Sequence, residues 1–146
     1  MLIDELKNIA RNNGIVGAGG AGFPAYAKMT EKADTVILNC VECEPLLKLH
    51  RQLLATHTEE IIQMLDEVRE SFGAKEAVIG IKSEYVTTIK AIEEVIGDFP
   101  KVRICALRAA YPMGDEVVLI YEATGRVIKP GGLPIDENVV VYNVET

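Results

Sequence analysis

The hydrophobic positions of this chain fall into two kinds of segment. Apolar, β-branched runs typical of buried strands occupy residues 35–40, 76–82, 102–107 and 139–144. Segments with the period of amphipathic helices occupy residues 2–13, about 46–72, 85–97 and 115–125. Because strands alternate with helices, the sequence predicts an α/β fold in which helices pack on a mostly parallel sheet.

Turn signals separate these segments. Asn13-Gly14 ends the first helix, and Pro24 predicts the start of a further short helix. The long helical pattern of residues 46–72 is expected to break near residues 56–58. Residues 126–137 are rich in Pro and Gly and are expected to form a loop.

Composition and charge narrow the possible functions. The chain has 146 residues, 49% hydrophobic and 25% charged, which suits a single globular domain spanning residues 1–146. Its net charge of −7 argues against a nucleic-acid partner, although a nest of backbone amides could hold a small anion. The chain contains no apolar run of about 18 residues, so its sequence predicts no membrane span. The N-terminus lacks a signal-peptide pattern. Three cysteines fit a reducing compartment, so a cytoplasmic location is expected.

The end of the sequence suggests a larger protein. The last predicted strand runs to Val144, and it is followed directly by Glu145 and Thr146. Domain ends usually fray into polar residues. We therefore expect this chain to be the N-terminal part of a longer protein.

The first candidate for a ligand site is a glycine-rich segment, GAGGAGFP at residues 17–24. Residues 17–22, called the glycine loop below, satisfy the pattern G-x-G-x-x-G. Glycine lets backbone amides approach a ligand closely, and a helix N-terminus beside such a loop can hold a phosphate. The dinucleotide-binding form of this pattern follows a strand, whereas the segment before this loop is expected to be helical. The pattern by itself leaves open a ligand site and a tight turn between two packed elements.

A second polar segment, NCVECEP at residues 39–45, follows the first predicted strand. Ligands of open α/β sheets bind outside the carboxyl ends of the strands, which favours a site here. Asn39 offers both a donor and an acceptor, and Glu42 and Glu44 can face one crevice if the segment is extended. The alternative is a solvated acidic turn.

The Cys-x-x-Cys spacing of Cys40 and Cys43 has further interpretations. The pair follows a strand and precedes a helix, as a thioredoxin-like redox pair does. A mixed zinc site could recruit His50 and His57, but that spacing matches no familiar zinc finger. A four-cysteine iron–sulfur centre needs one more thiolate than the chain holds. No metal site is predicted, and both histidines are expected to be exposed or half-buried.

Two later segments are candidates for the remaining walls of a site. The segment YPMGDE at residues 111–116 leads into a helix, where Asp115 is a candidate N-cap and Glu116 suits the first turn. Gly114 and the free amides beside it could alternatively form a ligand wall. The segment KPGGLP at residues 129–134 precedes the last strand. That strand leads, at the edge where α/β ligands bind, to Asn143, Glu145 and Thr146.

Taken in order, these segments resemble one known family. GIVGAGGAGFP with Lys28, NCVECEP, YPMGDE, KPGGLP and YNVET occur in the same order in the flavin-binding domain of the complex I NADH-oxidising subunit and its relatives. Those relatives include the RnfC-type component of the Rnf electron-transport complex and the cobalamin reductase of propanediol microcompartments. The match runs from Gly14 to Thr146. The resemblance implies a three-layer α/β unit that binds FMN noncovalently and receives NADH beside it. It also implies a location peripheral to a membrane complex or microcompartment.

The resemblance assigns roles to individual residues. The FMN-binding residues that it implies are Gly17, Gly19, Gly20, Lys28, Asn39, Glu42, Tyr111, Gly114, Asp115, Glu116, Asn143 and Thr146. Phe23 and Glu44 resemble the residues that receive NADH. No residue is expected to act as a covalent nucleophile, because the flavin carries the hydride chemistry.

The resemblance is incomplete at two points. Val41 stands where the complex I protein has an acidic residue, and the chain lacks the pattern C-x-x-C-x-x-C. Iron–sulfur clusters are therefore expected only outside this chain. The expected function is hydride transfer from NADH to FMN, with electrons passed on to an iron–sulfur domain or redox subunit. Two alternatives stay open: a flavin-free assembly module of the same fold, and a thiol oxidoreductase that uses Cys40 and Cys43.

Overall fold

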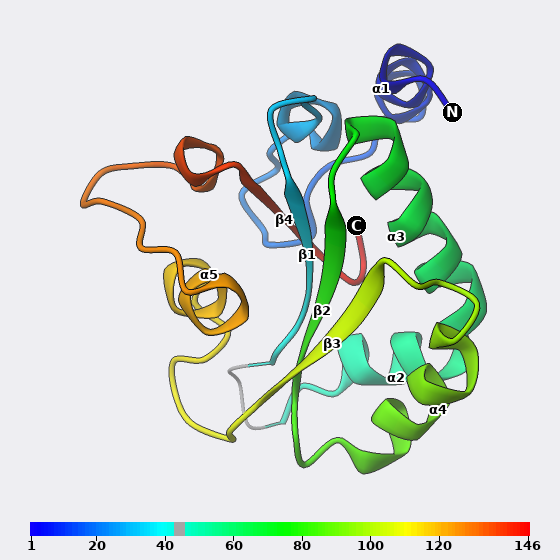
Figure 1. Cartoon of the computed structure of the whole chain (residues 1–146), viewed down its shortest axis with the longest axis vertical. Helices are drawn as coiled ribbons and strands as arrows, with labels where there is room; N and C mark the ends of the chain where they lie inside the picture. The colour runs from blue at the N-terminus through cyan, green and yellow to red at the C-terminus, as the bar shows by residue number, and fades with distance from the viewer. Residues whose placement is uncertain (43–45) are drawn as a thin grey trace.

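The computed structural model describes residues 1–42 and 46–146 (Figure 1). Its sheet consists of β1 (Thr35–Cys40), β2 (Glu76–Lys82), β3 (Val102–Leu107) and β4 (Val139–Asn143). The strand order is β3-β2-β1-β4, and all three neighbouring pairs are parallel. The carboxyl ends of the strands therefore lie along one edge of the sheet, where ligands of α/β folds bind.

Helices cover both faces of this sheet. The α-helices are α1 (Ile3–Asn12), α2 (Leu49–Thr56), α3 (Thr58–Phe72), α4 (Val86–Ile96) and α5 (Glu116–Thr124). Figure 1 shows α2, α3 and α4 on one side of the sheet and α5 on the other, with α1 beside the end of α3. This arrangement confirms the predicted three-layer α/β fold. Among the described residues, no helix combines the length and apolar character needed to cross a membrane.

The alternation of side chains along the strands divides the core into two parts. Val36, Leu38 and Cys40 of β1 belong to the core under α1–α4, whereas Ile37 and Val41 belong to the core under α5. All five of these side chains are buried. Because both faces of β1 are covered, its apolar residues form a continuous run rather than an alternating pattern.

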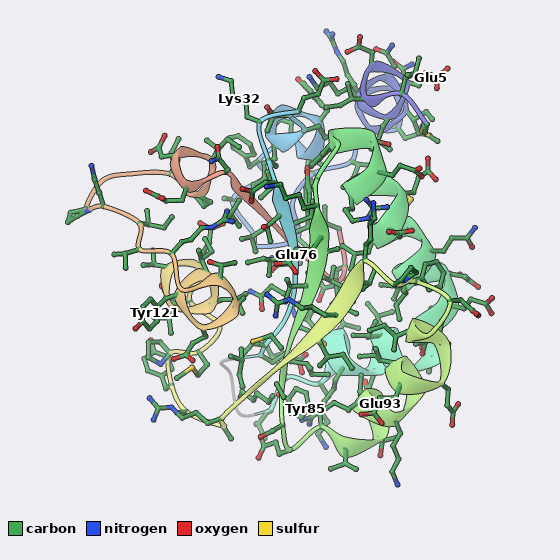
Figure 2. The ribbon with its side chains drawn as sticks, viewed as in Figure 1. Glu5, Lys32, Glu76, Tyr85, Glu93 and Tyr121 are labelled. Atoms are coloured by element: carbon green, nitrogen blue, oxygen red, sulfur yellow. The ribbon has the colours of Figure 1, made fainter. Side chains whose placement is uncertain are left out.

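The α5 layer approaches β2 closely at one glycine. A Cβ atom added to Gly80 would lie 2.6 Å from Cδ1 of Leu119, and Leu119 is fully buried. The missing side chain at Gly80 therefore makes room for α5. On the opposite side of α5, Tyr121 projects away from the sheet (Figure 2) and is 55% exposed.

The predicted elements agree with the structure except near proline. The short helix expected after Pro24 is a 3₁₀ helix, η1 (Ala25–Lys28), and Pro24 itself lies before it in an isolated antiparallel bridge with Val16. Within the expected loop at residues 126–137, a second 3₁₀ helix, η2 (Pro134–Glu137), places a proline at its start. The predicted break near residues 56–58 is confirmed as the junction of α2 and α3.

Candidate functional site

A cavity of about 260 Å³ lies at the carboxyl ends of β1 and β4. It brings together residues from the glycine loop, η1, both strands and the N-terminus of α5. Its lining residues are Gly17, Gly19, Ala21, Phe23, Lys28, Asn39, Gly114, Glu116, Val141, Tyr142, Asn143 and Thr146. Segments from both ends of the sequence therefore meet at the edge of the sheet where α/β ligands bind.

Asn39 lines this cavity, and two hydrogen bonds hold its side chain in place. It is paired in register with Asn143 of β4, so two side-chain amides lie next to each other at the sheet edge. The Nδ2 atom of Asn39 donates to the carbonyl of Gly114 at 3.3 Å, and its Oδ1 atom accepts from the amide of Val41 at 2.9 Å. These bonds fix the side chain between β1 and the segment before α5.

The glycine loop forms one wall as a closed turn. The amide of Gly17 donates to the carbonyl of Phe23 at 2.7 Å, beside the bridge between Val16 and Pro24. Gly20 has φ +88°, a conformation that side-chain-bearing residues adopt only with strain. The loop is therefore a tight turn held at its base, and Gly19 and Ala21 of the loop line the cavity.

Space for a ligand depends on the absence of a side chain at Gly19. A Cβ atom there would lie 3.4 Å from Nδ2 of Asn143, which also lines the cavity. Any larger side chain would extend into the space between the glycine loop and β4. A flat group with polar edges could lie against this backbone.

Lys28 brings a positive charge to the cavity. Its Nζ atom donates to the carbonyl of Val141 at 3.1 Å and lies 5.9 Å from the centre of the Tyr142 ring. The Tyr142 hydroxyl donates to the carbonyl of Ala25 at 3.2 Å, and burial raises the pKa of this phenol. The tyrosine therefore stays neutral, and Lys28 is the charged group that η1 contributes to the cavity.

A second cavity of about 530 Å³ adjoins the first. The two share Phe23, Lys28, Glu116 and Val141 in their linings. The second cavity continues past η1 and η2, with a largely apolar wall made by Ala27, Leu133, Pro134, Ile135, Val139 and Val140. Phe23, which is 49% exposed, lies at the boundary of the two spaces.

Several predicted site residues lie outside the lining of the first cavity. Asp115 uses its carboxylate as the N-cap of α5, where Oδ1 accepts from the amides of Val117 and Val118 at 3.0 and 3.3 Å. This confirms its predicted capping role. Tyr111 is 85% exposed, and Gly20 supplies the turn geometry of the loop. Glu44 lies outside the described residues.

Glu42 is buried and does not belong to the lining of the cavity. It is 5% exposed, and its Oε1 atom accepts from the amide of His50 at 2.8 Å, in the first turn of α2. Its backbone carbonyl accepts from Nζ of Lys82 at 2.6 Å. Within residues 1–42 and 46–146, its Oε2 atom has no hydrogen-bond partner. The carboxylate thus caps the first turn of α2 through its Oε1 atom.

The two histidines have different surroundings. The Nε2 atom of His50 lies 2.9 Å from Oε1 of Glu145, and both side chains are mostly buried, 19% and 27% exposed. His57 lies at the junction of α2 and α3 and is 55% exposed. The described part of the chain holds no group of three or more His, Cys, Asp or Glu residues placed to bind a metal.

The environment of Cys40 does not favour thiol chemistry. Its side chain is fully buried in β1, and burial, with a smaller effect of the nearby Glu42 carboxylate, raises its pKa to about 12. The reactive form of a cysteine is the thiolate, which Cys40 does not supply near neutral pH. Cys43, the other half of the predicted pair, lies outside the described residues.

Sequence reasoning missed three residues of the cavity wall: Ala21, Val141 and Tyr142. A signal for one of them is present in the sequence. Val141 precedes Asn143 by two positions in a strand, so the two side chains share a face. Tyr142 points to the opposite face and contributes only because β4 is an edge strand beside η1.

The fold and this site together define an α/β unit with a cofactor-sized cleft at the carboxyl edge of a parallel sheet. Residues 10–146 match the family model described as the Nuo51 FMN-binding domain. The chain therefore belongs to the Nuo51 FMN-binding domain family.

Individual relatives agree with this assignment. The chain is 40% identical over 141 residues to the cobalamin reductase PduS of Citrobacter freundii, covering 97% of this chain and 31% of that protein. It is 37% identical over 147 residues to a component of the Na⁺-translocating ferredoxin:NAD⁺ oxidoreductase complex of Acetobacterium woodii, covering 98% and 33% respectively. The chain thus spans about a third of the length of these relatives.

A solved structure shows the same fold. The air-oxidised NAD⁺-reducing [NiFe]-hydrogenase contains a chain that superposes with a TM-score of 0.81 at 26% identity. That superposition covers 98% of this chain and 29% of the hydrogenase chain. The fold of this chain therefore also occurs in a chain of an NAD⁺-reducing hydrogenase.

Proposed function

We propose that this chain is the FMN-binding domain of an NADH-oxidising electron-transfer flavoprotein. The observation that carries the proposal is the pair of adjoining cavities, which share Phe23, Lys28, Glu116 and Val141 at the carboxyl edge of the sheet. One cavity is bordered by the glycine loop and the other by the apolar wall around η2. Two ligands could therefore lie side by side, as transfer between them requires.

The names of the similar proteins support a nicotinamide as the second ligand. One relative belongs to a ferredoxin:NAD⁺ oxidoreductase complex, one solved structure is an NAD⁺-reducing hydrogenase, and another relative is a reductase. Bound FMN would supply the redox chemistry, accepting a hydride from NADH and releasing electrons to iron–sulfur clusters outside this chain.

The residues of the first cavity would hold and orient the flavin. Gly19 leaves room for a ring, and the amides of Asn39 and Asn143 offer donors and acceptors to its polar edge. Lys28 would place its positive charge where negative charge develops upon reduction. Gly17, Gly114, Glu116 and Thr146 complete the proposed wall.

Other predicted residues would act from outside this wall. Gly20 shapes the loop, Asp115 fixes the start of α5, and Glu42 supplies a buried negative charge near the end of β1. We propose Tyr111 as a cover for the flavin, since its exposed ring stands on the segment that leads to Gly114.

Phe23 is the described residue best placed to receive NADH. It lines both cavities and keeps about half of its surface exposed, so its ring can stack on a base or nicotinamide. Glu44 is proposed as its partner for the ribose or carboxamide, on the strength of the family resemblance. Hydride transfer then requires no proton-transferring side chain from the described residues.

Titration of the purified chain with FMN, followed by anaerobic addition of NADH, tests the proposal. We expect quenching of flavin fluorescence on binding, and bleaching of the visible flavin absorbance when NADH reduces the bound flavin. Binding without bleaching would contradict NADH oxidation while leaving the FMN site intact. A folded chain that binds no FMN would contradict the proposal as a whole and favour the flavin-free alternative.

A further inference from the structure

We propose that His50 is a positioning residue for the flavin site, acting through Glu145 on the contact between the β4 turn and the glycine loop. The β4 turn is defined as residues 143–146, closed by the bond from the amide of Thr146 to the carbonyl of Asn143 at 3.0 Å. This inference rests on the proposed function only for its effect on FMN. The mechanical coupling is a property of the protein alone.

His50 joins the exits of two neighbouring strands. Its amide donates to Oε1 of Glu42 at 2.8 Å, and its Nε2 atom lies 2.9 Å from Oε1 of Glu145. Glu42 follows β1 and Glu145 follows β4, and these strands are adjacent in the sheet. His50 is in the first turn of α2, where an amide lacks an intrahelical acceptor, so Glu42 fixes its backbone while Glu145 fixes its ring.

The β4 turn is in contact with the glycine loop. The hydroxyl oxygen of Thr146 accepts from the amide of Ala18 at 3.0 Å. Before the turn, the amide of Val144 donates to the carbonyl of Asn39 at 3.3 Å. The turn is thus tied to β1 at its start and to the glycine loop at its end, and Glu145 is the residue between these two ties.

The His50–Glu145 contact is placed to limit movement of Thr146. The two side chains are 19% and 27% exposed, so the contact is less screened than an open surface pair. Glu145 directly precedes Thr146, and freeing its side chain gives the turn additional conformations. Fewer of these conformations keep the Thr146 hydroxyl on the amide of Ala18.

Three variants separate this role from general packing. His50→Leu removes the polar contact, and His50→Gln restores a nitrogen donor near the position of Nε2. His57→Leu is the matched control, because His57 also faces a carboxylate but lies at the junction of α2 and α3 and is 55% exposed. Glu145→Ala removes the same contact from the other side and serves if His50→Leu does not fold.

Two measurements are made on each variant. Amide hydrogen exchange of Ala18, followed by NMR without FMN, reports the contact with Thr146 directly. The FMN dissociation constant reports its effect on the site. We expect His50→Leu to speed Ala18 exchange and to weaken FMN by about three- to tenfold. His50→Gln should recover most of both values, and His57→Leu should match the wild type.

The outcomes distinguish failure of the His50–Glu145 coupling from failure of the proposed function. Unchanged Ala18 exchange in folded His50→Leu, or in Glu145→Ala, overturns the coupling. The coupling is also overturned if His50→Gln speeds Ala18 exchange and weakens FMN binding as much as His50→Leu does, because packing alone would then explain the effect. Faster Ala18 exchange in a protein whose wild type binds no FMN supports the coupling and contradicts the proposed function instead.

Discussion

The hydroxyl oxygen of Thr146 and the amide of Ala18 lie 3.0 Å apart, although 128 positions separate them in sequence. The bond fixes the tip of the glycine loop to the turn after the last strand. Both Thr146 and the neighbouring Gly19 line the cavity. The shape of the proposed flavin site therefore depends on one hydroxyl group.

Replacing Thr146 by valine tests this bond. The variant keeps the shape of the side chain but leaves the Ala18 amide without its acceptor, which costs about 1 kcal/mol for a typical hydrogen bond. We expect FMN to bind about three- to tenfold more weakly, as measured by fluorescence titration. Thr146→Ser retains the hydroxyl and should bind FMN nearly as well as the wild type. Equal loss in both variants would contradict a role for the hydroxyl.

A side chain at Gly19 should obstruct the flavin directly. Valine there would place a branched group beside Nδ2 of Asn143, in the space between the loop and β4. We expect Gly19→Val to weaken FMN binding by about 1–3 kcal/mol, the usual cost of overfilling a packed space. Circular dichroism and thermal unfolding establish that the variant folds. Unchanged FMN affinity in the folded variant would refute this placement of the ring.

Close packing of α5 on β2 predicts a stability effect that is separate from ligand binding. A methyl group at Gly80 would meet the buried Leu119 side chain at 2.6 Å, so Leu119 or the helix must move. We expect Gly80→Ala to lower the free energy of unfolding in urea by about 1–3 kcal/mol. Gly97→Ala is the control, because Gly97 has φ −58° and no atom within 4 Å of an added Cβ. An equal effect of the two substitutions would contradict the packing argument.

The buried thiol of Cys40 predicts a difference in reactivity between cysteines. Its pKa is raised to about 12, whereas the Cys105 thiol, whose pKa is also raised by burial, is only partly buried. At about pH 8, below the ordinary thiol pKa, we expect iodoacetamide to modify Cys105 before Cys40, as mapped by mass spectrometry of peptides. Prompt modification of Cys40 in the folded protein would revive the thiol-oxidoreductase alternative.

The same pKa predicts how stability changes at alkaline pH. The folded state keeps the Cys40 proton at pH values where an unfolded thiol, with its ordinary pKa of 9.0, has lost it. Stability from this group is therefore complete below pH 9 and falls as pH rises toward 12. The stability advantage of the wild type over Cys40→Ala should shrink across this range. If the difference in unfolding free energy between the wild type and Cys40→Ala stayed constant across this pH range, the raised pKa of Cys40 would be contradicted.

Strand and helix prediction succeeds where hydrophobic periodicity is strong. The strands predicted at residues 35–40, 76–82 and 102–107 have the bounds that the structure shows. Periodicity carries no information about backbone pairing, so it does not predict the bridge between Val16 and Pro24. The short helix predicted after Pro24 is present as the 3₁₀ helix η1, directly after that bridge.

Prediction of the site is limited by side-chain direction. Asn39, Gly114 and Asn143 can be assigned to one edge of the sheet, because parallel strands end there. The N-cap role of Asp115 is predicted from its place before a helix, but sequence spacing cannot show that Glu42 turns to cap α2. Both carboxylates are drawn to unpaired amides at a helix start, a preference that depends on where each helix begins.

The bond between Ala18 and Thr146 has a consequence for how the protein is made. The Thr146 hydroxyl is synthesised 128 residues after Ala18, its partner in the glycine loop. Domains take shape as their residues emerge, and this site cannot be completed until residue 146 is free to fold back. A ligand that binds only the completed cleft therefore binds after residue 146 has been synthesised, and its binding free energy adds to the stability of the folded state.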